Sequence, residues 1–314
     1  MKIINVSKEL FNKSGNNIFY HYTSTDALIS IISNSKLRFT NCLFLNDMEE
    51  YNYILDLINC EYAKRDDDKS LLVYELTKNL FDYYFNYDKY KNVNEIIAYY
   101  MISFQNERKF HIEKGEYYVL SGSLKQDLLP LWVYYSKNDR YDGYSIKMNV
   151  SSIASSFKNL EGEFLYGRII YDKQEQLKII DDFVEELFLK YDIKNLDDQQ
   201  SDDLQNEFFD YIQLIRLFFK RDGFSNEREF RVAINTNGTK NEKNKNLGFN
   251  HSNGVIKPYI EYYFEDGLPI EEIMLSPSIE EKLGKEGVRT LLNYYNRTKY
   301  KDVNINKSSL QLRF

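Results

Sequence analysis

The sequence is poor in the residue types that mark several common classes of protein. It has two cysteines, Cys42 and Cys60, and four prolines among 314 residues. Two scattered cysteines exclude a disulfide framework and are typical of a reducing cytoplasm. No run of eighteen apolar residues occurs, so we expect no membrane-spanning helix. The first eleven residues lack the pattern of a signal peptide. We therefore expect a cytoplasmic protein without a membrane partner.

Basic residues and motifs for common enzyme sites are also scarce. The chain has 41 Lys and Arg against 48 Asp and Glu, a net charge of −7, which argues against a broad nucleic-acid surface but not against a small basic groove. It has no glycine-rich phosphate loop and no Gly-x-Ser-x-Gly elbow. The three histidines lack zinc-ligand spacing, and no paired cysteines support them. The sequence therefore gives no support to a metal site or to acyl transfer.

Aromatic residues are abundant instead, with 28 tyrosines and 21 phenylalanines. A general amino-acid bias, seen also in the many Asn, Lys and Ile residues, explains much of this number. It is compatible with a site in which several tyrosines line a planar ligand.

Strand and helix patterns are spread along the whole chain. We expect strands at about 17–22, 36–41, 117–123, 143–150, 162–171, 227–234, 255–264, 270–275 and 303–305. We expect helices at about 25–34, 128–136 and 279–295, and two longer helical blocks at about 50–105 and 173–221. The expected irregular segments are a leader at 1–15, exposed turns at 66–68 and 196–203, and a loop at 236–250. Because no linker or repeat divides the chain, these patterns predict one α+β domain over 1–314, with the two blocks as insertions.

The first candidate site group is His21-Tyr22-Thr23-Ser24, at the point where a strand becomes a helix. Ser24, Thr25 or Asp26 can cap that helix. A histidine at a strand end can donate to or accept from a ribose hydroxyl, or it can merely fix the loop.

The second group is the aromatic segment from Leu131 to Ser136, which holds the only tryptophan. Trp132 and Tyr135 lie three residues apart and share one face of a helix. They can enclose a nicotinamide or a base, although aromatic pairs at this spacing usually belong to a core.

The third group is Glu227-Arg228-Glu229-Phe230-Arg231-Val232. On a strand, Glu227, Glu229 and Arg231 share one face. This face is an exposed strand face, a salt-bridge ladder, or a catalytic carboxylate with its support. A second carboxylate raises the pKa of a carboxyl group and an arginine lowers it, so the pattern leaves these readings open.

Taken together, these motifs resemble the bacterial domain-of-unknown-function family 2971. The resemblance covers most of the chain from about residue 18. It rests on His21-Tyr22-Thr23-Ser24, Leu37-Arg38-Phe39, Asn46-Asp47 with Glu50, Trp132 with Tyr135 and Gly143, Asn226 to Arg231, Lys257-Pro258-Tyr259-Ile260 and Ile270-Glu271-Glu272-Ile273. It departs at Ser276-Pro277, where a Gly-Pro is expected.

The motif order of that family resembles the ADP-ribosyltransferase fold, which implies a split β-sheet core and NAD as substrate. By this resemblance His21 and Thr23, with Tyr22 between them, would hold the nicotinamide side of NAD, and Trp132 or Tyr135 would stack on the ring. Glu229, or else Glu227, would bind the ribose 2′-hydroxyl and stabilise an oxocarbenium-like transition state. Arg231 would orient the carboxylate or contact a phosphate.

The same resemblance leaves Asn46 and Asp47 either beside the site or capping a helix. It implies transfer of ADP-ribose to an unknown protein or nucleic-acid acceptor, in a toxin or phage-defence role. Two alternatives remain: a noncatalytic nucleotide or nucleic-acid sensing module, and a nuclease-like effector using Asp47, Glu50, Glu227 and Glu229.

Overall fold

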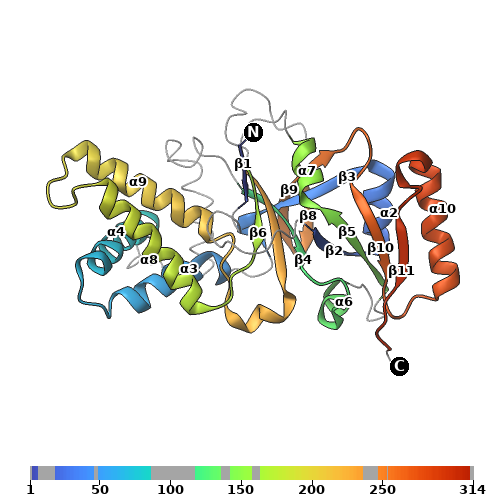
Figure 1. Ribbon diagram of the computed structural model, residues 1–314, viewed down its shortest axis with the longest axis horizontal. Coiled ribbons are helices and arrows are strands. Elements are labelled where there is room, and N and C mark those ends of the chain that lie inside the picture. Colours follow the sequence, from blue (N-terminus) through green and yellow to red (C-terminus); the bar gives the residue numbers. More distant parts are fainter. Residues whose placement is uncertain are drawn as a thin grey trace. The chain divides into compact units, whose positions relative to one another are not determined.

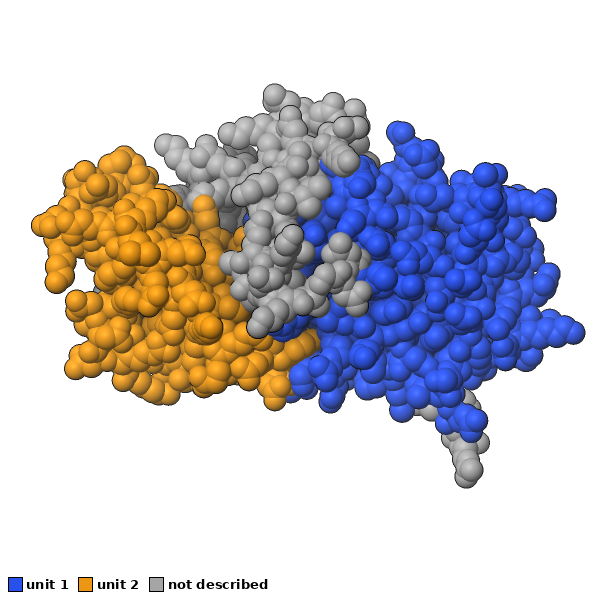
Figure 2. Space-filling view, viewed as in Figure 1, with its two compact units in different colours: residues 1–44, 116–169, 223–314 blue, residues 45–115, 170–222 orange. Residues whose placement is uncertain are grey.

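The computed structural model describes residues 2–5, 18–45, 49–85, 117–135, 142–157, 163–235, 247–252 and 254–311. The chain forms two compact units, each made of segments that are distant in sequence (Figure 1, Figure 2). Unit 1 comprises residues 1–44, 116–169 and 223–314, and unit 2 comprises residues 45–115 and 170–222. The two expected helical insertions therefore account for most of unit 2.

Unit 1 contains a large, mostly antiparallel sheet, as expected for an α+β protein (Figure 1). Its main path within the described residues runs β1-β6-β7-β4-β2-β5-β10-β11. The strands of this path are β1 (Lys2–Asn5), β2 (Ile18–Ser24), β4 (Tyr117–Ser123), β5 (Gly143–Asn149), β6 (Glu163–Arg168), β7 (Glu229–Asn235), β10 (Ile270–Leu275) and β11 (Asn304–Lys307).

The sheet forks at β4. One end of β4 pairs with β2 through Tyr20 and Ser123, and its other end pairs with β3 (Lys36–Asn41) through Thr40 and Val119. From β3 the second branch continues to β9 (Val255–Tyr263) and then β8 (Leu247–Ser252). Gly122 lies at this fork, where a Cβ would come within 2.5 Å of the Phe19 ring and 2.8 Å of the Tyr20 main-chain oxygen. Only glycine allows this close approach.

One face of the sheet carries the main hydrophobic core. Alternate residues of the central strands, such as Phe19, Ile146 and Val232, pack there. Three helices supply the opposing apolar residues: α2 (Thr25–Asn34), α7 (Val150–Ser156) and α10 (Glu281–Tyr300). The other face carries a small cluster of Tyr22, Leu131 and Trp132, of which the last two come from α6 (Leu129–Tyr135).

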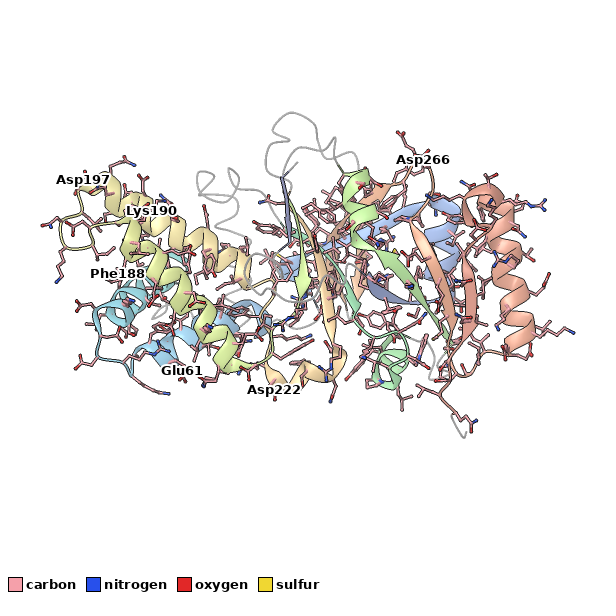
Figure 3. The ribbon with its side chains drawn as sticks, viewed as in Figure 1. Glu61, Phe188, Lys190, Asp197, Asp222 and Asp266 are labelled. Atoms are coloured by element: carbon pink, nitrogen blue, oxygen red, sulfur yellow. The ribbon has the colours of Figure 1, made fainter. Side chains whose placement is uncertain are left out.

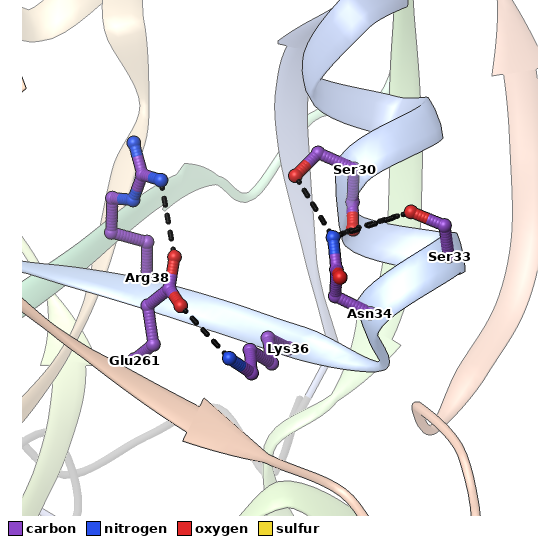
Figure 4. Close-up of polar contacts among 6 residues, drawn as sticks. All are labelled: Ser30, Ser33, Asn34, Lys36, Arg38 and Glu261. Carbon is purple, nitrogen blue, oxygen red and sulfur yellow. Dashed lines mark hydrogen bonds and ion pairs between the residues drawn. The ribbon is translucent and has the colours of Figure 1, made fainter. Parts of the chain in front are cut away.

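Helix α2 begins where the sequence predicts. Ser24 is the N-cap, and its hydroxyl accepts from the Ala27 amide. At the other end Ser35 adopts a left-handed conformation with φ of 48°, which ends the helix before β3. On β3, Lys36 and Arg38 both donate to Glu261 of β9 (Figure 4).

Unit 2 is helical in its described part. Its helices are α3 (Glu49–Tyr62), α4 (Asp68–Phe85), α8 (Lys173–Lys190) and α9 (Asp198–Ile215). Buried Gln176 links three segments, because its amide donates to the Ile170 and Lys220 main-chain oxygens and accepts from Tyr53. Figure 3 labels Asp197 and Lys190 in this unit. Asp197 forms a capping box with Gln200 at the start of α9, and Lys190 pairs with Glu207.

Several sequence expectations need correction. Residues 2–5 of the expected leader form β1, paired in parallel with β6, a long-range contact with no local signal. The expected turn at 196–203 is mostly the first part of α9, because acidic residues also favour a helix N-terminus. Helix α7 takes Val150 from the end of the expected strand at 143–150, and β8 takes residues 247–250 from the expected loop at 236–250. Residues 86–105 of the first helical block lie outside the described residues.

Candidate active site

Strand β7 places Glu229 and Arg231 on the face of the sheet opposite the main core. It pairs with β4 on one side and β6 on the other, and all seven of its residues are buried. Phe230, Val232 and Ile234 belong to the main core, so the alternating residues Glu229 and Arg231 face the other way. The predicted sharing of one face by Glu229 and Arg231 is therefore confirmed.

Glu229 and Arg231 form a two-point ion pair. Arg231 Nε donates to Glu229 Oε1 at 2.7 Å and an Arg231 terminal nitrogen donates to Oε2 at 3.1 Å. Their side chains are 8% and 3% exposed. A buried charge is tolerated when it is paired and hydrogen-bonded, and the planar guanidinium matches both carboxylate oxygens. Of the two roles expected for Arg231, orientation of the carboxylate is the one present in this arrangement.

Glu227 does not lie on the strand, contrary to expectation. It ends the short 3-10 helix η2 (Asp222–Glu227), and Arg228 follows with φ of 48° before β7 begins. The left-handed residue breaks the alternation that the sequence pattern predicts. Glu227 therefore does not share the strand face of Glu229 and Arg231.

A row of polar residues crosses five strands on the Glu229 side of the sheet. Register places Glu229 opposite Ser123, Ser123 opposite Tyr20, Tyr20 opposite Lys147, and Lys147 opposite Glu272. Directly opposed residues share a face. Tyr20 and Ser123 are thus two site residues that the motif analysis missed. The signal was present, since Tyr20 and Tyr22 alternate with His21, but only strand pairing shows which alternate set faces Glu229.

His21 lies at the fork of the sheet. Its Nδ1 is 3.0 Å from the main-chain oxygen of Ser121 on β4, the residue opposite Arg231 on β7. A carbonyl oxygen can only accept, so Nδ1 carries the proton and Nε2 of the neutral ring is an acceptor. Burial lowers the pKa of His21 below its usual 6.5, which keeps the ring neutral near pH 7. His21 pairs with Ile146, a residue of the main core, so its side chain starts from the face opposite Glu229, contrary to the expectation that the two share one site.

Thr23 and Tyr22 lie on different faces of β2. Thr23 is buried and pairs with Tyr144, a residue of the main core, so its side chain starts from the face opposite Glu229. Tyr22 lies on the Glu229 side, where its hydroxyl donates to the Lys125 main-chain oxygen and accepts from the Leu128 amide. Burial raises the pKa of Tyr22 well above its usual value. Both hydroxyl contacts of Tyr22 join β2 to the segment before α6.

Trp132 and Tyr135 occupy different environments on α6. Trp132 is 1% exposed and packs edge-on against Tyr22, with ring centroids 4.8 Å apart. Its Nε1 donates to the Asp127 carboxylate at 2.8 Å. Tyr135 is 42% exposed and stacks on Tyr22 with ring centroids 6.3 Å apart. Of the two residues expected to contact a ring, Tyr135 is the accessible one and Trp132 is part of the small cluster.

The remaining candidate residues are Asn46, Asp47 and Glu50. Asn46 and Asp47 lie outside the described residues, and Glu50 lies in α3 of unit 2. Among the residues that the structure describes, no group of three or more His, Cys, Asp or Glu residues is arranged to hold a metal ion. No helix in the described part is long and apolar enough to cross a membrane.

The comparisons with known proteins identify a family for one segment. Residues 131–232 match the family described as "Protein of unknown function (DUF2971)". Over this segment the match supports the family expected from the motifs, and the segment contains Trp132, Tyr135, Glu229 and Arg231. No curated protein and no solved structure matches the chain.

Proposed function

We propose that the chain is an NAD-dependent ADP-ribosyltransferase-like enzyme. In the proposed reaction the bond between the ribose C1′ and the nicotinamide nitrogen breaks, and its electron pair leaves with neutral nicotinamide. A nucleophile of a macromolecular acceptor then forms the new bond to C1′ and loses a proton. With water as the acceptor, the same site would act as an NAD glycohydrolase.

The observation that carries the proposal is the Glu229 carboxylate, fixed by Arg231 on the central strand β7. Loss of nicotinamide builds positive charge on the ribose, and an anion held nearby stabilises that state more than the ground state. The two bonds from Arg231 hold both carboxylate oxygens in a fixed orientation.

The residues around Glu229 suit the rest of this substrate. We assign His21 no contact with this ribose, because its side chain starts from the other face of the sheet. Tyr20 is on the Glu229 face, two strands away, and Tyr135 offers an accessible ring for stacking. We assign the carboxylate role to Glu229 and not to Glu227, because only Glu229 is on the strand face.

The burial of the ion pair favours a second candidate, a noncatalytic nucleotide or nucleic-acid sensing module. A carboxylate and a guanidinium that are 8% and 3% exposed also suit a purely structural role. The two candidates differ in turnover, since a sensing module binds its ligand and leaves the nicotinamide–ribose bond intact.

The test is nicotinamide release from NAD by the full chain, with and without a bacterial lysate as the source of acceptor. We expect release by the wild type and a loss of about 100-fold or more in Glu229→Gln, as for removal of one electrostatic catalytic group. The matched control is Glu286→Gln on the exposed face of α10, which should leave release unchanged. An equal loss in Glu227→Gln would contradict the assignment to Glu229, and NAD binding without release would favour the sensing module.

A further inference from the structure

The main chain immediately before Glu229 is in an unfavourable conformation. Arg228 has φ of 48°, in the left-handed region that residues with a Cβ seldom adopt. Its side chain is exposed, so packing of that side chain does not account for the conformation. Something else must hold the turn, because such a residue persists only when its surroundings fix it.

Ser123 supplies that restraint from the neighbouring strand. Its hydroxyl donates to the Glu227 main-chain oxygen at 2.8 Å and lies 3.3 Å from the Arg228 main-chain oxygen. The same hydroxyl accepts from the Lys125 amide at 3.1 Å. The Leu124 amide donates to the Arg228 oxygen at 2.8 Å. The two carbonyl groups on either side of the left-handed residue are therefore both held by β4 and the residue that follows it.

Ser123 is also the residue directly opposite Glu229 in the register of β4 and β7. It is fully buried, and its single hydroxyl proton is directed to the main chain and not to the carboxylate. We infer that Ser123 is a positioning residue for Glu229, which acts by holding Glu227 and Arg228 in the turn that starts β7. This inference rests on the proposed function, because it assumes that the placement of the Glu229 carboxylate matters for nicotinamide release.

The expected consequence is a change in rate and not in NAD affinity. Without the Ser123 hydroxyl, the turn is free to relax toward ordinary backbone angles and to shift the start of β7. A displacement of about 1 Å at a catalytic group can cost on the order of 100-fold in rate. We expect Ser123→Ala to lower kcat for nicotinamide release by about 10- to 100-fold, with KM for NAD changed by less than about threefold.

The chain offers a matched control and a specific rescue. Ser145 on β5 is another fully buried serine on the same side of the sheet, and its hydroxyl has no hydrogen-bond partner among the described residues. Ser145→Ala should therefore leave kcat unchanged. Glycine adopts left-handed angles freely, so Arg228→Gly should restore most of the kcat lost in Ser123→Ala. General loosening of the fold would not be corrected by a glycine at this one position.

The inference is overturned if Ser123→Ala keeps the wild-type kcat, if its defect is in KM alone, or if Arg228→Gly gives no rescue. Should Ser123→Ala fail to fold, Ser123→Cys is the replacement variant, with the same expected loss and rescue. If the wild type releases no nicotinamide, the proposed function fails. A double-mutant cycle on the free energy of unfolding then tests whether Ser123 restrains Arg228. The effects of Ser123→Ala and Arg228→Gly on stability should be non-additive, and additive effects would show that Ser123 does not restrain Arg228.

Discussion

Arg231 donates to both carboxylate oxygens of Glu229, two residues away on the same strand. Neighbours at this spacing point to the same side of a strand, so the pair forms within β7 itself. A carboxylate held in this way has a fixed position before any ligand binds. The predictions below concern this pair, the fork of the sheet beside it, and the helix that covers the same face.

The first prediction concerns the stability of the ion pair. Arg231→Met should destabilise unit 1 by about 3–5 kcal/mol, because it leaves a buried carboxylate without its partner. Urea unfolding followed by the emission of Trp132, the only tryptophan, measures the loss in unit 1. Arg38→Met is the control, since Arg38 also pairs with a glutamate, Glu261, but is 43% exposed and should lose at most about 1 kcal/mol. Equal losses in the two variants would contradict the buried pair.

The second prediction concerns Gly122 at the fork. Gly122→Ala should cost about 1–3 kcal/mol, because its Cβ meets the Phe19 ring and the Tyr20 main chain within 3 Å. A Cβ added at Gly287 on α10 would meet no described atom within 4 Å. Gly287→Ala should therefore stabilise the protein by up to about 1 kcal/mol. The same unfolding measurement compares them, and a neutral Gly122→Ala would mean that β2 and β4 do not approach as described.

The third prediction concerns the pH dependence of stability. Burial lowers the pKa of His21 in the folded state, so the unfolded state binds more protons once the pH falls below about 6.5. The stability that the neutral His21 ring contributes is therefore fully present above pH 6.5 and is lost as the pH falls toward the pKa of His21 in the folded state. The free energy of unfolding changes by at most about 1.4 kcal/mol per pH unit from this group.

His21→Gln isolates this effect, because its amide can still donate to the Ser121 oxygen but does not titrate. The free energy of unfolding should fall less between pH 7.5 and pH 5 in the variant than in the wild type. Groups such as Asp127 and Glu261, whose pKa values are lowered, act equally in both proteins. An unchanged pH dependence in His21→Gln would show that His21 is not buried at the fork.

The fourth prediction concerns the two aromatic residues of α6. Trp132 is enclosed, so its emission should be shifted to short wavelength and quenched only weakly by acrylamide in the folded state. Tyr135→Ala should weaken NAD binding by about 5- to 10-fold, in keeping with the loss of one aromatic stack. Strong quenching of Trp132 by acrylamide, or unaltered NAD binding in Tyr135→Ala, would contradict these assignments.

The parts of the fold with local signals were predictable from sequence. Alternation predicted β7 and placed Arg231 beside Glu229, and the polar residues before Ala27 predicted the start of α2. Contacts between distant segments were not predictable. Residues 2–5 form a strand only because β6 is beside them, and the fork exists only because β4 changes partners along its length.

The candidate site shows the same difference between local signals and contacts between distant segments. Residue types made Glu229 and His21 candidates, but only the strand register shows that Tyr20 and Ser123 share a face with Glu229. Glu227 fits an extended pattern as well as Glu229 does, and only the left-handed Arg228 separates the two. Likewise, the spacing of Trp132 and Tyr135 did not distinguish the buried ring from the exposed one.

The most direct test of the central claim is a crystal structure of the Glu229→Gln variant soaked with NAD. The account predicts the nicotinamide ribose beside residue 229, with its 2′-hydroxyl within about 3.2 Å of the side-chain amide. NAD bound away from β7, or a ribose beyond hydrogen-bond reach of residue 229, would contradict the account.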